Sequence, residues 1–225
     1  MPLKLALFDC DGTLADSQYA IVAGMRDAFA ACSLPAPDAA AICGAIGLSL
    51  PRFIATLTPS ADEAQRSALV DAYRDAYFTH RTAAGAAPEP LFGGITACLD
   101  VLTSQGWQLG VATGKSQRGL IRLLDAHGIL DRFVTLQTAD NHPSKPDPAM
   151  ALAAMAQAVV DPAHTVVIGD TGYDMMMARG AGAHALGVAW GYHPPAELSA
   201  AGAHAIAQAP DAIPDALARL IGEAA

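Results

Sequence analysis

LFDCDGTL, residues 7–14, closes a short apolar run with two carboxylates two positions apart and a glycine. The run itself, LKLALF over residues 3–8, lies between Pro2 and this acidic cluster, which predicts a strand that is buried on both faces. At the end of an extended strand, residues two positions apart point to the same side, so Asp9 and Asp11 are expected to face one site. Two like charges at one place require a partner that neutralises them.

The same pattern of a strand that ends in small or polar residues recurs along the chain. It is found in QLGVAT (108–113), HTVVIGD (164–170) and AHALGVAW (183–190). Helical patterns lie between these runs, over residues 95–105, 116–128 and 147–159. Strands that alternate with helices predict an α/β protein, with a Rossmann-like parallel sheet as its core and helices on both faces.

Residues 16–90 break this alternation, because every pattern in them is helical: 17–32, 38–46, 50–57 and 60–85. Ser60 and Glu63 have the spacing of a capping box at the start of the last one. A segment rich in proline and glycine, AAPEPLFGGI, then leads back to the alternating pattern. We therefore predict a catalytic core of residues 1–15 and 91–225 and an inserted all-helical cap of residues 16–90, which covers the carboxyl edge of the sheet where ligands bind.

The composition limits the classes of partner. Hydrophobic residues make up 52% of the 225 residues, which is ample for a packed core, and the formal charge of −9 argues against a nucleic-acid partner. No apolar stretch approaches the roughly twenty residues of a membrane span. The four cysteines are scattered, without the close spacing of a zinc site. We expect a cytoplasmic protein that binds neither membranes nor nucleic acid; the composition does not define its oligomeric state.

Polar residues follow the predicted strands at positions that a parallel sheet would bring together. Because the carboxyl ends of its strands share one edge, residues far apart in the sequence converge there. A cluster of carboxylates favours a hard divalent cation, and Mg²⁺ is the leading candidate. A cation, an ammonium group and a hydroxyl around a carboxylate suit phosphoryl transfer. The residues concerned are Asp9, Asp11, Gly12, Thr113, Gly114, Lys145, Asp170 and Asp174.

Four motifs carry a resemblance to a known family. DCDGTL (9–14), ATGKS (112–116), SKPDP (144–148) and GDTGYDMMMA (169–178) resemble, in order and spacing, the signature of the haloacid dehalogenase superfamily. The chain is similar to the subgroup whose helical cap follows the first motif, which includes phosphoglycolate phosphatases and β-phosphoglucomutases. The resemblance implies a phosphoric monoester hydrolase that acts on a small phosphorylated metabolite.

The resemblance also implies roles for individual residues. Asp9 matches the nucleophile that forms an aspartyl-phosphate, and Asp11 matches the general acid and base. The carboxylates of Asp9 and Asp170, with the backbone carbonyl of Asp11, match the ligands of Mg²⁺. Asp174 matches a second acid of the last motif, which supports the metal site or orients Lys145.

Other matched residues bind the substrate. Thr113 and Lys145 match the pair that holds the phosphate, and backbone amides around Gly12 and Gly114 are further donors to it. In the predicted cap, Arg52 is a candidate contact for an anionic leaving group, although we prefer to interpret it as a solvated helix arginine. Lys115 and Ser116 are interpreted chiefly as the start of the helix after Thr113. His193 and Tyr192, after the strand at 183–190, are expected at the same edge of the sheet.

Three functions remain open at this point. The first is a Mg²⁺-dependent phosphatase, for substrates such as phosphoglycolate, a sugar phosphate, a nucleotide or pyrophosphate. The second is a phosphomutase of the β-phosphoglucomutase type, and the third is a non-catalytic binding module on the same fold. Two related chemistries are excluded: residues 16–90 contain no lysine for a Schiff base, and Asp11 indicates an oxygen leaving group instead of a halide.

Overall fold

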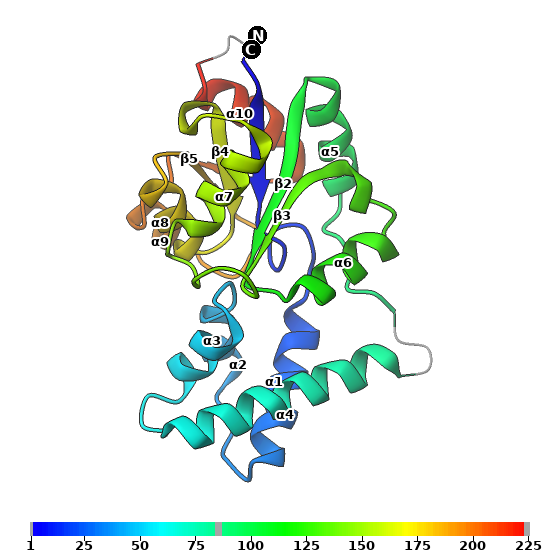
Figure 1. Ribbon diagram of the computed structural model, residues 1–225, viewed down its shortest axis with the longest axis vertical. Helices are drawn as coiled ribbons and strands as arrows, with labels where there is room; N and C mark the ends of the chain where they lie inside the picture. Colours follow the sequence, from blue (N-terminus) through cyan, green and yellow to red (C-terminus); the bar gives the residue numbers. More distant parts are fainter. Residues whose placement is uncertain (1, 84–86, 223–225) are drawn as a thin grey trace.

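The computed structural model of the chain describes residues 2–83 and 87–222. Strand β1 (Lys4–Phe8) lies inside a six-stranded sheet with the strand order β3-β2-β1-β4-β5-β6 (Figure 1). All neighbouring strands pair in parallel. The other strands are β2 (Trp107–Thr113), β3 (Phe133–Thr138), β4 (Thr165–Gly169), β5 (His184–Val188) and β6 (Ala205–Ala207). The predicted α/β core with a parallel sheet is confirmed.

Two strands were not expected from the sequence. Strand β3 mixes polar and apolar residues and leaves Val134 exposed, as its place at the edge of the sheet allows. Strand β6 has three residues and forms the opposite edge. Neither has the continuous apolar run that marks a strand covered on both faces, which is why the sequence pattern predicts only the four inner strands.

Helices cover both faces of the sheet (Figure 1). Side chains alternate along β1, so Ala6 and Phe8 belong to one apolar cluster and Leu5 and Leu7 to the other. The first cluster includes residues of α5 (Ile95–Ser104), α6 (Gln117–Ala126) and α10 (Ile213–Leu220). The second includes residues of α7 (Ala149–Ala158), α8 (Gly172–Gly180) and α9 (Pro195–Ala200). Short 3₁₀ helices span Leu130–Arg132, Pro162–His164 and Pro210–Ala212.

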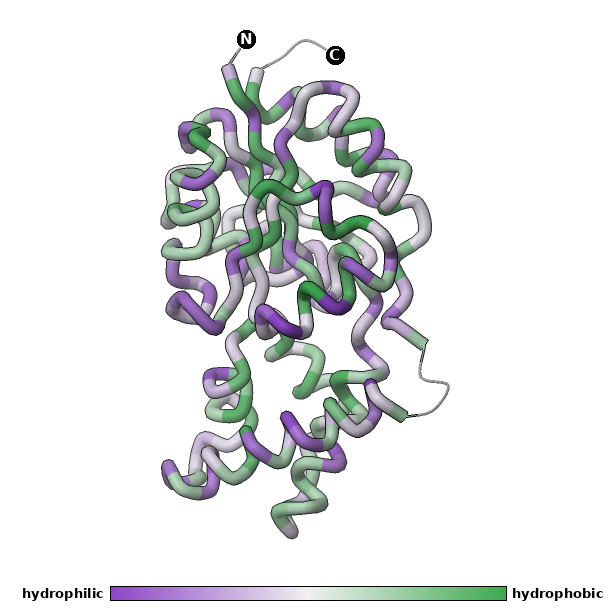
Figure 2. Tube along the Cα trace, turned by 45° about the vertical axis from the view of Figure 1, so that its right-hand side comes forward, coloured by the Kyte–Doolittle hydropathy of each residue, from purple (hydrophilic) through white to green (hydrophobic). Residues whose placement is uncertain are grey.

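Four further helices pack together at the end of the molecule that is distant from the chain termini (Figure 1). They are α1 (Gln18–Ala31), α2 (Ala39–Gly44), α3 (Leu50–Leu57) and α4 (Glu63–Thr82). They share an apolar cluster that includes Met25, Phe29, Ile42, Ile54 and Leu69. Figure 2 shows hydrophobic stretches in this unit as well as along the strands of the core. The helices therefore have a core of their own, and we call this unit the cap.

The capping box predicted for Ser60 and Glu63 is wrong. Helix α4 starts after Asp62, whose carboxylate accepts a hydrogen bond from Gln65 N at 2.8 Å, while Gln65 Oε1 accepts one from Asp62 N at 3.2 Å. A turn closed by Ala61 N and Thr58 O leaves Ser60 outside the helix. Residues 84 and 85, the last of the helical pattern at 60–85, lie outside the described residues.

The two connections between core and cap run side by side. Ala15 and Leu91 form an antiparallel bridge, Asp16 N donates to Pro90 O at 2.9 Å, and Phe92 N donates to Leu14 O at 3.0 Å. These contacts support our proposal that the cap begins at residue 16 and ends at residue 90. Among the described helices, none is long and apolar enough to cross a membrane.

Candidate active site

Three acidic residues from two sequence motifs meet at the carboxyl edge of the sheet. Asp9 directly follows β1, Asp170 directly follows β4, and Asp174 lies in the first turn of α8. One carboxylate oxygen from each lies within 4.8 Å of the others. All three side chains are buried, so their charges have little access to solvent.

Lys145 is fully buried between two of these carboxylates. Its Nζ lies 2.9 Å from Asp9 Oδ1 and 2.6 Å from Asp174 Oδ1. Burial disfavours the charged ammonium, but Asp174 and Asp9 outweigh burial and raise the pKa of Lys145 above its usual value. Lys145 is therefore a permanent cation at the centre of the cluster.

Asp174 is held by its own helix. Its Oδ2 accepts hydrogen bonds from Thr171 Oγ1 at 2.6 Å and from Thr171 N at 3.1 Å, and the Thr171 side chain in turn caps α8. Because both of its oxygens are engaged, by Lys145 and by Thr171, Asp174 fixes the position of the ammonium group.

Asp170 is fixed by two donors. Its Oδ1 accepts a hydrogen bond from Thr13 Oγ1 at 2.8 Å, and its Oδ2 accepts one from Tyr192 N at 2.9 Å. Burial and then the charges of Asp9 and Asp174 raise the pKa of Asp170 well above its usual value. Gly12 has a φ of +89°, and a Cβ at this position would lie 2.2 Å from Asp170 Oδ2, so only glycine fits beside this carboxylate.

Asp9 has one oxygen to spare. Its Oδ1 accepts a hydrogen bond from Cys10 N at 2.6 Å and faces Lys145, whereas the buried Oδ2 has no hydrogen-bond partner among the described residues. Burial raises the pKa of Asp9 to about 7, although Lys145 partly offsets the shift. The Lys145 ammonium group thus pairs with two of the three clustered carboxylates, Asp9 and Asp174, while Asp170 is held by uncharged donors. This donor set fits a hard cation with oxygen ligands.

Thr113 and Gly114 lie at the end of β2. Thr113 is 1% exposed, and its hydroxyl oxygen accepts a hydrogen bond from Lys115 N at 3.2 Å, which leaves its proton for another acceptor. A Cβ on Gly114 would lie 2.4 Å from the carbonyl oxygen of Leu48 in the cap. Core and cap backbones therefore approach each other closely at this point.

Lys115 lies beside Asp11 at the carboxyl edge of the sheet, a position that was not predicted from the sequence. Helix α6 begins at Gln117, Ser116 is its N-cap, and Lys115 precedes the helix. The Lys115 Nζ lies 2.8 Å from Asp11 Oδ1 and donates to Tyr77 Oη of the cap at 3.1 Å. The scarcity of lysine, three in the chain, was the available signal.

Asp11 borders a cavity of about 710 Å³ between core and cap. Aromatic and aliphatic side chains form part of its wall, among them Phe53, Tyr73 and Tyr77. Gly114 and Lys115 line the same cavity, so it reaches the carboxyl end of β2, directly after Thr113. A cavity of this size can hold the leaving group of a small organic phosphate.

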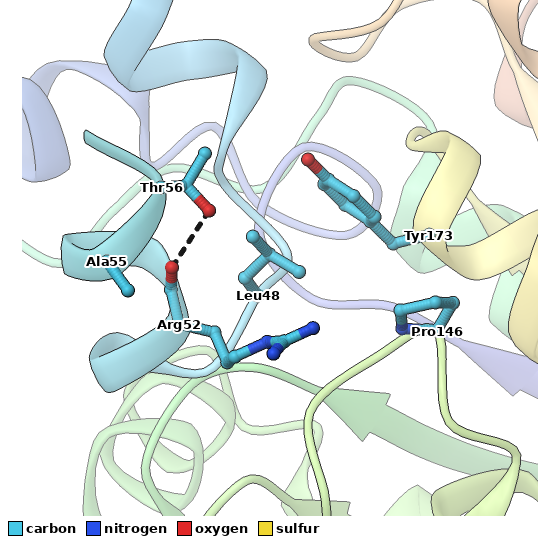
Figure 3. Close-up of a pocket in the computed structure, with 6 residues that line it drawn as sticks. All are labelled: Leu48, Arg52, Ala55, Thr56, Pro146 and Tyr173. Atoms are coloured by element: carbon cyan, nitrogen blue, oxygen red, sulfur yellow. Dashed lines mark hydrogen bonds between the residues drawn. The ribbon is translucent and has the colours of Figure 1, made fainter. Parts of the chain in front are cut away.

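The structure does not bring Arg52 to this cavity. Arg52 lines a separate pocket of about 260 Å³ together with Leu48, Ala55, Thr56, Pro146 and Tyr173. Figure 3 shows its guanidinium group extended between Leu48 and Pro146, and Thr56 Oγ1 bonded to its backbone carbonyl.

Tyr192 and His193 connect core and cap. Tyr192 Oη accepts a hydrogen bond from Ser17 N at 3.2 Å. His193 Nδ1 lies 3.3 Å from Gly172 N, and its Nε2 lies 3.1 Å from Gly44 O, at the end of α2. These contacts set Nδ1 as an acceptor and Nε2 as a donor, so the His193 ring joins the start of α8 to the cap. The backbone N–H of His193 donates to the backbone carbonyl of Asp170 at 3.3 Å.

Comparisons with known proteins agree with this geometry. Residues 6–188 match the family of haloacid dehalogenase-like hydrolases. The probable phosphatase IndB of Dickeya dadantii is 35% identical over 98% of this chain and 93% of its own length. A plasmid-borne phosphoglycolate phosphatase of Cupriavidus necator is 30% identical over 95% of this chain and 93% of its own. A hydrolase of Pseudomonas syringae of known structure superposes with a TM-score of 0.83 at 26% identity, over 96% of this chain and 98% of the other.

Proposed function

The chain belongs to the haloacid dehalogenase-like hydrolase family and to the phosphatases within it, and from this premise we propose that it is a Mg²⁺-dependent phosphatase of a small phosphorylated metabolite. One observation carries the proposal: a buried ammonium group, Lys145, lies between Asp9 and Asp174, while Asp9 Oδ2 has no hydrogen-bond partner in the part of the chain that the structure describes. A carboxylate that is buried, oriented and only partly satisfied is suited to nucleophilic attack on phosphorus.

Asp9 and Asp170 are the residues that would hold Mg²⁺ through their carboxylates, with the backbone carbonyl of Asp11 as a third ligand. When bound, the cation would offset the negative charge of the buried acids and of the phosphoryl oxygens. The side chain of Asp11 faces Lys115, away from this role, and Asp174 is engaged by Lys145 and Thr171. This division agrees with a supporting function for Asp174.

The residues of the chain account for both halves of the reaction. Lys145 and the Thr113 hydroxyl bind the phosphoryl oxygens, and Asp9 attacks phosphorus to form an aspartyl-phosphate. The bond from phosphorus to the leaving oxygen breaks, and Asp11 gives that oxygen a proton. Asp11 then takes a proton from water, which attacks phosphorus and releases inorganic phosphate, and Asp9 is restored as a carboxylate.

Hydrolysis is favoured over the mutase and the binding module by two relatives that span nearly the whole chain and are phosphatases by name, those of Dickeya dadantii and Cupriavidus necator. We propose 2-phosphoglycolate and sugar phosphates as the first substrates to test. We also place the protein in the cytoplasm, where a reducing environment suits four cysteines that are all free.

The test is phosphate release from a panel of phosphorylated metabolites, with Mg²⁺ and with a chelator, by wild type and by Asp9→Asn. We expect activity that requires the cation and falls by roughly 10³-fold or more in the variant, because an amide cannot form the phosphorylated intermediate.

Asp131→Asn provides the matched control, because Asp131 is exposed in the 3₁₀ helix before β3, at the opposite end of the strands. Its activity should equal that of wild type. Full activity in Asp9→Asn, or release that the chelator leaves unchanged, would refute the mechanism, and isomer formation without phosphate release would indicate the mutase.

A further inference from the structure

Lys115 is a buried cation at the boundary between the proposed acid and the substrate cavity. Its side chain is 8% exposed, and its Nζ lies 2.8 Å from Asp11 Oδ1 and 3.1 Å from Tyr77 Oη. The ammonium group also lies 5.4 Å from the centre of the Tyr77 ring. It therefore touches core and cap at the place where a leaving group would depart.

Among the described residues, Asp11 is the acid that forms an ion pair with Lys115. Tyr77 Oη donates to Glu89 Oε1, and the other oxygen of Glu89 pairs with Arg81 at 3.2 Å. Glu89 is thus already balanced, and Tyr77 offers Lys115 a neutral oxygen. Asp11 is the carboxylate that faces the ammonium group, and it has to turn toward the leaving oxygen to exchange a proton with it. In the substrate complex, Lys115 consequently requires another anionic partner.

The cavity as a whole is basic compared with the rest of the chain. Five of the thirteen lysines and arginines line it, whereas only four of the twenty-two acids do, on a chain with a net charge of −9. Two of those four acids are Asp11 and the paired Glu89. The basic residues are Arg74, Arg81, Lys115, Arg118 and Arg122. This concentration of positive charge favours an anionic ligand.

We propose that the leaving group of the substrate carries a carboxylate and that Lys115, supported by Tyr77, is the residue that binds it and sets specificity for it. The inference rests on the proposed phosphatase function and deepens it. Apolar residues of the cavity wall, such as Ile21, Ile46 and Phe53, face the carbon skeleton of the leaving group. A buried ammonium group that is already oriented binds a carboxylate with little further loss of side-chain freedom.

The test compares two substrates with the same skeleton, 2-phosphoglycolate and 2-hydroxyethyl phosphate, which differ by a carboxylate in place of a hydroxymethyl group. The kcat and KM of each are measured for wild type and for Lys115→Met. We expect wild type to prefer the carboxylate by about ten- to a hundredfold in kcat/KM, and the variant to lose this preference. Any effect of the substitution on Asp11 acts on both substrates and cancels in their ratio.

Three further variants sharpen the result. Lys115→Arg keeps the charge and should retain part of the preference. Tyr77→Phe removes the hydroxyl that holds Lys115 and should lower the preference a few-fold; it also serves if Lys115→Met does not fold. Arg118→Met removes one charge from the same cavity, where the guanidinium group stacks on Phe78 at 5.1 Å, and should keep the preference.

The outcomes separate the two proposals. If wild type hydrolyses both substrates without discrimination, or if Lys115→Met slows both equally, the specificity role of Lys115 is refuted while the phosphatase remains. An equal loss of preference in Arg118→Met would mean that the basic residues of the cavity attract the carboxylate together, and would also refute the specific role of Lys115. A wild type that releases phosphate from no substrate refutes the phosphatase function itself.

Discussion

At the scale of single residues, the site is defined by an imbalance of charge. Asp9, Asp170 and Asp174 are buried close together, and the Lys145 ammonium group pairs with two of them, Asp9 and Asp174. Burial is the largest cause of the raised pKa of Asp9 and Asp170. Such acids destabilise the folded protein when they are ionised and uncompensated. The arrangement is therefore suited to a state in which a cation is bound. Without the cation, the buried acids should lower the stability of the folded protein by a measurable amount.

The substitution Asp170→Asn tests this cost. An asparagine can accept the hydrogen bond from Tyr192 N and donate to Thr13 Oγ1, so the geometry is preserved while one buried charge is lost. Without Mg²⁺, we expect a melting temperature equal to or higher than that of wild type. Addition of Mg²⁺ should raise the melting temperature of wild type and leave the variant unchanged.

Thermal unfolding with and without Mg²⁺ provides the measurement, and Asp131→Asn, which should respond to Mg²⁺ like wild type, is the control. A variant that Mg²⁺ still stabilises as strongly as wild type would show that Asp170 is not a ligand.

At the scale of elements, the ends of helices show how local chemistry sets positions. Helix α8 starts at a capping box made by Thr171 and Asp174, and the same Asp174 orients Lys145, so one helix start serves both stability and the site. Helix α4 starts at the box made by Asp62 and Gln65 and carries Tyr77 to the cavity. The exact first residue of a helix therefore decides which side chains it presents.

Asp62→Ala should destabilise the protein by about 1 kcal/mol, since it removes the acceptor of Gln65 N at the start of α4. Ser60→Ala is the matched control: Ser60 is exposed and lies outside the helix, and its removal should change the free energy of unfolding very little. Urea denaturation of both variants measures the difference. Equal stabilities, or a larger loss in Ser60→Ala, would contradict the observed capping box.

At the scale of the whole molecule, function depends on how the cap lies on the core. The two segments that connect core and cap are hydrogen-bonded to each other. Tyr173 and Tyr192 of the core pack against the apolar cluster of the cap, and the backbone at Gly114 lies close to the cap backbone. Lys115 and Tyr77 come from the two units and meet in the cavity. The proposed substrate cavity exists because these contacts hold the cap in a fixed position on the core.

Gly114→Ala tests whether the position of the cap on the core matters, because the added Cβ would lie 2.4 Å from the carbonyl oxygen of Leu48 and the cap would have to move. We expect kcat/KM to fall by about tenfold to a hundredfold, with the stabilisation by Mg²⁺ unchanged. Gly180→Ala at the end of α8, where the nearest atom is 3.5 Å from the added Cβ, should keep wild-type activity. Full activity in Gly114→Ala would show that the close approach is not needed.

The sequence determined the elements whose signals are local. The four inner strands are continuous apolar runs, and their buried positions in the sheet confirm them, whereas the edge strands β3 and β6 lack this signal. The convergence of Asp9, Asp170, Asp174 and Lys145 was also predictable, because parallel strands have their carboxyl ends at one edge.

Only the tertiary structure decided what the cap places over that edge. Lys115 was interpreted as the start of a helix, yet it lies beside Asp11. Arg52 was a candidate contact for the leaving group, with a solvated helix arginine preferred, and it lines another pocket. The physical reason is that strand and helix patterns depend on neighbours in sequence, whereas the packing of one unit on another depends on the shapes of both surfaces together. No repeat or spacing in the sequence predicts how the cap packs on the core.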